Sequence, residues 1–147
     1  FEKQPVVSLV ERGGKVRSFH VAKVTGPLLR QILVTNAHRG SWLMTDELAG
    51  YKTVGKEYVG HGVVSHSRGE YGRKGVFHTN TIEGFFSIFK RGIIGVYHHV
   101  SEAHLQRYTA EFDFRYNTRE LNDFERSTEA LKGARGKRLT YRRPVAA

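Results

Sequence analysis

One stretch of the chain places acidic, hydroxyl and basic side chains at a spacing that suits chemistry on a phosphate group. Glu83, Ser87 and Lys90 stand at positions i, i+4 and i+7, which share one face of a helix. A carboxylate and an ammonium group would then project together, about 10 Å apart along the helix axis. Such a pair suits a metal site that also holds a phosphate. The alternative is the ordinary exposed polar face of an amphipathic helix.

A second carboxylate, Asp46, directly follows the apolar run Trp42–Thr45. An aspartate after a strand is often only the N-cap of the next helix. A carboxylate at the end of a strand can nevertheless meet one on a later helix that packs across the sheet. Converging carboxylates bind hard divalent cations, and two such ions assist in-line phosphoryl transfer. Because the chain has no cysteine, its oxygen groups favour Mg²⁺ or Mn²⁺ over a thiolate zinc site.

The charge of the chain points to a polyanionic partner. Its 24 basic and 14 acidic residues give a formal charge of +10, which attracts DNA or RNA at long range. The composition is that of an ordinary globular protein, and we find no apolar run long enough to span a bilayer. The first residue is Phe1 rather than Met, so we expect a piece of a longer protein.

The length and the C-terminal sequence predict one domain followed by a tail. A chain of 147 residues fits a single core, which we expect over residues 1–131. Residues 132–147 open with a basic stretch that contains no acid. That stretch is either a solvated tail or an arm that binds phosphates.

The hydrophobic pattern predicts a mixed α/β fold with a central sheet. Pro5–Val10 and Val16–Val21 form a β-hairpin around a glycine turn, and Trp42–Thr45 is a buried strand. A further strand covers Tyr58–His66, and the polar stretch after it is a loop.

Five helices complete the expected fold. The first is capped by Thr25, another begins near Glu47, and a third starts at Thr79 and is broken by Gly92 and Gly95. The fourth starts at Ser101, and a last short helix follows it. Asp113 is expected on the surface of the fourth helix, and the last helix spans Phe124–Leu131.

The chemistry-bearing residues lie in motifs that resemble a known family. The run His78–Ser87 followed by Lys90-Arg91-Gly92 resembles the closing motif of the ISXO-like insertion-sequence transposases. Similar pieces occur in the expected order between Pro5 and Arg119. They are Leu9–Gly14, Thr45–Glu47, Tyr51, Val64–Tyr71, Tyr97–Ser101, His104–Tyr108, Glu111–Phe112 and Phe114–Asn117.

The resemblance implies an RNase H-like fold of the retroviral integrase superfamily, a mixed sheet flanked by helices. Asp46 then matches the second acid of the DDE triad, Glu83 the third, and Lys90 the basic residue that follows it. The implied activity is Mg²⁺- or Mn²⁺-dependent DNA cleavage and strand transfer. The implied partners are the element ends and target DNA, in the cytoplasm and nucleoid of a bacterium.

The chain departs from the family at its start, because no aspartate precedes Asp46. The family's first catalytic Asp lies on a central first strand, so the fold is expected to be N-terminally truncated. Its unpaired sheet edges would then recruit a second chain, as a homodimer or a higher oligomer. We expect the chain alone to be inactive. The alternatives are a non-catalytic DNA-binding remnant and an RNase H-like nuclease.

Further residues are candidates for contact with the nucleic acid. Their alternative roles are a helix cap or an ordinary solvated loop, and the remaining histidines are expected to be structural rather than zinc ligands. The nucleic-acid candidates are Lys90, Arg91, His78, Asn80, Arg68, Tyr71, Arg73 and Lys74.

Overall fold

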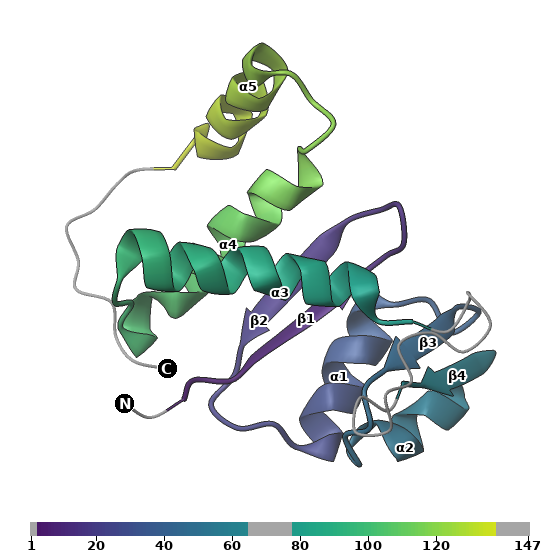
Figure 1. Cartoon of the computed structure of the whole chain (residues 1–147). Coiled ribbons are helices and arrows are strands. Elements are labelled where there is room, and N and C mark those ends of the chain that lie inside the picture. Colours follow the sequence, from purple (N-terminus) through teal and green to yellow (C-terminus); the bar gives the residue numbers. More distant parts are fainter. Residues whose placement is uncertain (1–2, 65–77, 138–147) are drawn as a thin grey trace. The chain divides into compact units, whose positions relative to one another are not determined.

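The computed structural model describes residues 3–64 and 78–137 and has a mixed α/β fold, as expected (Figure 1). The contacts divide the chain into two compact units. The terminal unit is Phe1–His20 with Ser87–Ala147, and the central unit is Val21–Phe86. The single domain over residues 1–131 with a tail over 132–147 stays a prediction. No helix in the described ranges is long and apolar enough to cross a membrane.

The hairpin of the terminal unit is confirmed within one residue at each end. Strands β1 (Val6–Val10) and β2 (Val16–His20) pair antiparallel, with Val10 opposite Val16 and Ser8 opposite Ser18. Gly13 has a φ of 69°, which glycine adopts without steric cost, and this allows the tight connection. The two serine hydroxyls are 2.8 Å apart.

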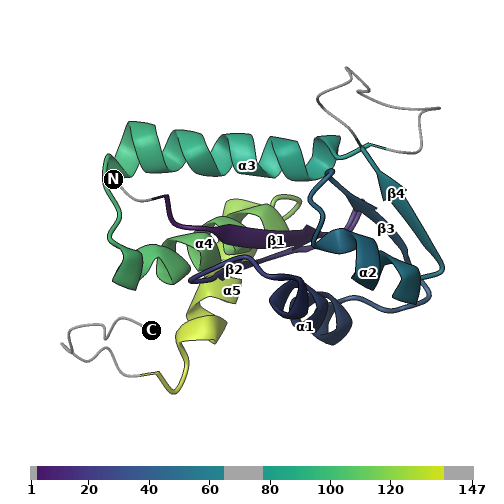
Figure 2. The same cartoon turned by 90° about the horizontal axis from the view of Figure 1, so that it is seen from below.

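The outer edge of β2 is closed by side chains of helix α4 (Glu102–Asn117), which lies beside it (Figure 1, Figure 2). The Asn117 amide pairs with the N–H and the carbonyl of Val16, at 2.7 and 2.9 Å. Both Asp113 carboxylate oxygens accept from Ser18, one from its N–H and one from its hydroxyl, at 2.6 Å each. Gln106 also bonds the backbone of β2, at 2.7 and 3.2 Å. Within the terminal unit, this edge is therefore unavailable for strand pairing.

The expected surface position of Asp113 is wrong, because its carboxylate joins α4 to β2 and is half-buried. Burial raises the pKa of Asp113 above its ordinary value, and the hydrogen bonds from Ser18 and the nearby charge of Arg17 offset this only in part. The folded state therefore takes up the proton at a higher pH than the unfolded chain.

This raised pKa predicts a pH dependence of stability. Between the ordinary pKa and the raised one, the folded state binds the proton and the unfolded chain does not, so stability from this group rises as the pH falls. We expect the free energy of unfolding to increase, relative to Asp113→Asn, as the pH is lowered from 7 towards about 4. Urea unfolding of both proteins across that range measures it, and a parallel pH dependence in the two would contradict it.

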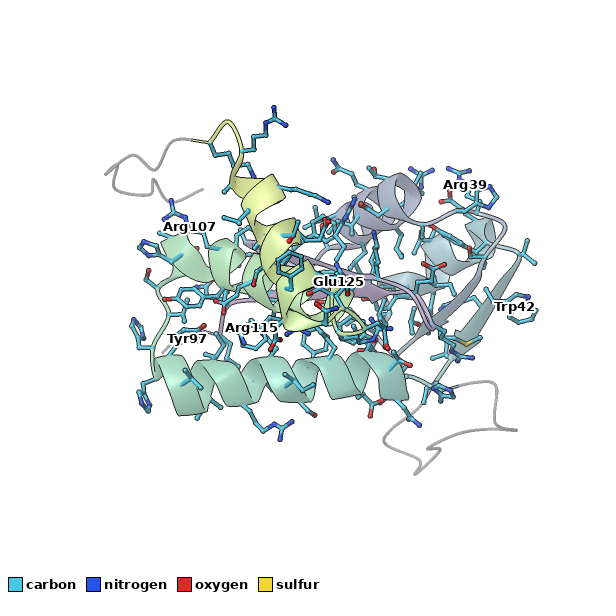
Figure 3. All side chains as sticks on the ribbon, turned by 90° about the horizontal axis from the view of Figure 1, so that it is seen from above. Arg39, Trp42, Tyr97, Arg107, Arg115 and Glu125 are labelled. Atoms are coloured by element: carbon cyan, nitrogen blue, oxygen red, sulfur yellow. The ribbon has the colours of Figure 1, made fainter. Side chains whose placement is uncertain are left out.

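The central unit contains a parallel pair of strands. Strand β3 (Trp42–Thr45) has the predicted bounds and pairs with β4 (Gly60–Val63), with Trp42 opposite Gly60 and Thr45 opposite Val63. The prediction of a buried strand is confirmed only in part, because Thr45 is buried but the Trp42 side chain is 59% exposed and projects from the unit (Figure 3). Strand β4 is shorter than the strand expected over residues 58–66, because it begins at Gly60 and ends at Val63. Ser65 and His66 lie outside the described residues.

Helix α1 (Gly26–Asn36) contributes buried side chains to the core of the central unit. Thr25 caps it as predicted, its hydroxyl accepting from the Leu28 N–H at 3.4 Å. Helix α2 (Tyr51–Val54) and the 3₁₀ turn η1 (Gly55–Glu57) follow. The helix expected from Glu47 therefore starts four positions later, because residues 46–50 are irregular and end in a turn at residues 49–50. Leu29, Ile32, Leu33 and Val54 are buried in this unit.

Helix α3 (Asn80–Gly92) begins where the pattern predicted, but Gly92 does not break it. The chain continues as a π-helical turn, η3 (Ile93–Tyr97), because glycine is only unfavourable in a helix and not excluded from it. In the terminal unit, the Phe89 ring meets the Phe112 ring of α4 edge to face, with centroids 5.1 Å apart. The expected helix after Ser101 is α4.

The last helix is confirmed as α5 (Asp123–Ala134). It begins with a capping box between Asn122 and Glu125, whose side chains each accept from the other's backbone N–H. Figure 3 marks Glu125 at this end of the helix. Phe124 and Leu131 of α5 are exposed.

Candidate metal and DNA site

The backbone around Asp46 is held at both ends of its turn. The N–H of Val64 donates to the Thr45 carbonyl at 2.9 Å, which extends the pairing of β3 and β4 by one bond. After β3 the chain turns, and the N–H of Leu48 donates to Asp46 Oδ1 at 3.1 Å. Asp46 thus caps a turn rather than a helix. Its side chain is exposed, so it is accessible to a cation or a phosphate.

A polar chain on one face of the β3–β4 pair supports the same turn. The Thr45 hydroxyl donates to the Asp46 carbonyl at 2.9 Å and lies 2.8 Å from Nε2 of His61. Thr45 is buried and His61 half-buried. Burial lowers the pKa of His61, which favours the neutral form of its ring.

The charge of Asp46 affects the pKa of Tyr51, which lies at the start of α2. Burial raises the pKa of the Tyr51 phenol, and the nearby carboxylate of Asp46 raises it further. An anion destabilises a neighbouring phenolate, so the Tyr51 hydroxyl stays protonated.

The second predicted acid, Glu83, lies in the first turn of α3. The buried Thr79 immediately before the helix accepts the Glu83 N–H at its carbonyl, at 3.0 Å, and its hydroxyl donates to Glu83 Oε1. The helix start therefore positions this carboxylate, which is exposed. Ser87 and Lys90 are exposed as well, while Phe85 and Phe89 are buried. The predicted polar face of the helix is confirmed, and its role stays a prediction.

The two predicted acids belong to the same compact unit. Asp46 and Glu83 lie in the central unit, whereas Lys90 and Arg91 lie on the part of α3 that belongs to the terminal unit. His78 lies just before α3 and is half-buried, and Asn80, the first residue of α3, is exposed. Across residues 3–64 and 78–137, no three His, Asp or Glu side chains gather so as to hold a metal ion. The nucleic-acid candidates Arg68, Tyr71, Arg73 and Lys74 lie outside the described residues.

The sequence patterns did not identify the residues that support Asp46. His61 was expected to be structural, and no role was predicted for Thr45. The available signal was indirect, since a hydroxyl residue precedes Asp46 and a histidine occupies the neighbouring strand. Their proximity depends on the parallel register of β3 and β4.

The comparison with protein families agrees with the motifs. A family model described as an ISXO2-like transposase domain matches residues 2–117, nearly the range from Pro5 to Arg119 over which the resemblance extends. No curated protein and no solved structure matches the chain. Since the family model covers well over half of the 147 residues, the chain belongs to the ISXO2-like transposase family.

Proposed function

We propose that this chain is the catalytic domain of an insertion-sequence transposase, which cleaves DNA at the element ends and joins the liberated 3′-hydroxyl to target DNA. One observation carries the proposal most directly. In a chain of the transposase family, the two carboxylates that we propose as its acids, Asp46 and Glu83, are exposed on one compact unit. The enzyme would act on DNA in the bacterial cytoplasm.

The donor groups suit Mg²⁺ or Mn²⁺. Both ions prefer oxygen ligands, and Mg²⁺ is commonly bound by one or two carboxylates together with water and substrate phosphate. Asp46 Oδ1 is engaged by the Leu48 N–H, which holds the carboxylate in one orientation. We propose Asp46 and Glu83 as the ligands. When bound, the ion would stabilise negative charge on the oxygens of the reacting phosphate.

Basic side chains would hold the DNA backbone. Lys90 follows Glu83 by two helical turns on the exposed face of α3, and Arg91 is its exposed neighbour. Their cations neutralise phosphates, so binding to DNA should weaken as salt is raised. His78 and Asn80 at the start of α3, and the basic and aromatic residues of the segment before it, would add contacts to DNA.

The fold is proposed to be an RNase H-like sheet that lacks its first strand. Among the described residues, β1 pairs with β2 and β3 with β4, in two separate two-stranded sheets. In this proposal, a central strand that carries the family's first aspartate would complete the sheet. With two of three acids, the chain by itself should bind metal weakly and cleave poorly, and its open strand edges favour a dimer or a higher oligomer.

Metal-dependent stabilisation of the chain tests the site. We expect Mn²⁺ to raise the thermal midpoint of the 147-residue protein by about 1–3 °C at millimolar metal, because an ion that binds only the folded state stabilises it. Glu83→Gln should abolish the shift. Glu129→Gln is the matched control, since it removes the same charge from an exposed position on α5 in the other unit.

A non-catalytic DNA-binding remnant is the second candidate. It is favoured by the absence of any aspartate before Asp46 together with the charge of +10. This candidate predicts salt-sensitive DNA binding that Glu83→Gln leaves unchanged, and no Mn²⁺ effect on the thermal midpoint. DNA binding without any metal response would therefore replace the catalytic proposal by this one. An RNase H-like nuclease would require the same carboxylates but perform no strand transfer.

A further inference from the structure

The turn that carries Asp46 depends on a hydrogen-bonded chain that begins on the neighbouring strand. His61 of β4 lies on the same face of the sheet as Thr45, because Leu43 is its partner in the parallel register and side chains two positions apart share a face. The histidine ring packs against the backbone of Gly55, where an added Cβ would overlap it. A larger residue at Gly55 would therefore displace the ring.

The direction of each hydrogen bond in this chain follows from the groups involved. A carbonyl oxygen only accepts, so the single proton of the Thr45 hydroxyl is donated to the Asp46 carbonyl. The hydroxyl oxygen must then accept from His61, so Nε2 of the ring carries the proton. The order is His61 Nε2–H to Thr45 Oγ1–H to the Asp46 carbonyl.

These bonds restrict both the backbone and the side chain of Asp46. The carbonyls of Thr45 and Asp46 are held by the Val64 N–H and the Thr45 hydroxyl, and the Leu48 N–H holds Asp46 Oδ1. The direction of the Asp46 carboxylate is therefore set before any ligand arrives. A preorganised carboxylate loses less freedom when it binds a cation.

We propose that His61 is a positioning residue for Asp46, whose Nε2–H holds the Thr45 hydroxyl on the Asp46 carbonyl and so fixes the direction of the carboxylate. This inference rests on the proposed role of Asp46 as a metal ligand. His61 reaches the ligand through Thr45 and the backbone, and partners of this kind commonly tune the affinity of a metal site.

Substitutions in the full 147-residue chain test this role. We expect His61→Leu and Thr45→Val each to weaken Mn²⁺ binding, titrated by electron paramagnetic resonance, by about tenfold, while His61→Gln and Thr45→Ser stay within about threefold. Gln and Ser retain the donor that each position needs. Far-UV circular dichroism of each single variant verifies that it is folded.

A second measurement needs no metal. The Leu48 amide proton donates to Asp46 Oδ1, so its hydrogen exchange reports how firmly the turn is held, and His61→Leu should accelerate it while His61→Gln should not. If Leu48 exchange and Mn²⁺ affinity are both unchanged in His61→Leu, the positioning role is overturned. If Asp46→Asn leaves Mn²⁺ binding unchanged, the proposed metal site fails instead, and faster Leu48 exchange in His61→Leu still supports the positioning of Asp46.

Discussion

Replacing Glu83 by Gln is expected to abolish Mn²⁺-dependent nicking of supercoiled plasmid by a form of the protein extended upstream to include the proposed strand with the first acid. Gln keeps the size of the side chain and its acceptor for the Thr79 hydroxyl, but it removes the charge that a divalent cation requires. Metal stabilisation of the reacting phosphate contributes several kcal/mol, so the loss should be about 10²–10³-fold or more in rate.

The control for this experiment is binding to the same plasmid. Glu83→Gln should leave DNA affinity unchanged or slightly higher, because it removes a negative charge near the phosphates. Lys90→Ala should weaken binding and reduce its salt dependence, while Glu129→Gln should leave both binding and nicking as they were. Nicking that persists in Glu83→Gln would remove Glu83 from the proposed site.

Replacing Asp113 by Ala is expected to destabilise the terminal unit by about 1–3 kcal/mol, because the buried N–H of Ser18 loses its acceptor. The substitution leaves the N–H of Ser18 without an acceptor, whereas the Ser18 hydroxyl can turn to the Ser8 hydroxyl 2.8 Å away, and Ser18 is only 3% exposed. A buried donor that loses its partner costs about 1–3 kcal/mol. Urea unfolding followed by far-UV circular dichroism measures the effect, since the single tryptophan, Trp42, belongs to the central unit and reports on the other part of the chain.

Asp113→Asn is the matched variant. Its carbonyl oxygen can accept from the Ser18 N–H, and its amide can donate to the Ser18 hydroxyl, which then donates to Ser8 at 2.8 Å. All three groups keep partners, so we expect a cost below about 1 kcal/mol at pH 7. Equal losses in the Ala and Asn variants would show that the charge of Asp113, rather than its two acceptors, stabilises the contact between α4 and β2.

The elements that sequence reasoning located well are those with strong local signals. Thr25 with Pro27 marks the start of α1, and the glycines after β1 mark the hairpin turn, because caps and turns depend on a few adjacent residues. The phenylalanine spacing of α3 separates its buried face from the face of Glu83 and Lys90. Local chemistry is sufficient in these cases.

Predictions failed where a distant segment decides the outcome. The pattern of its own helix predicts that Asp113 lies on the surface. It nevertheless accepts two hydrogen bonds from Ser18, which lies far away in the sequence. The apolar pattern of its own strand predicts that Trp42 is buried, yet its side chain is exposed. The polarity of a segment does not specify which segment packs against it.

The sequence by itself determined the charge, the order and type of most elements, the family motifs and the two carboxylates that we propose as metal ligands. Only the tertiary structure decided how those groups are held. The parallel register of β3 and β4 brings His61 to Thr45, and the packing of α4 on β2 brings Asn117 and Asp113 to the strand edge. These contacts join residues that are distant in the chain, so they arise from the pairing of whole elements, which no local pattern of residues encodes.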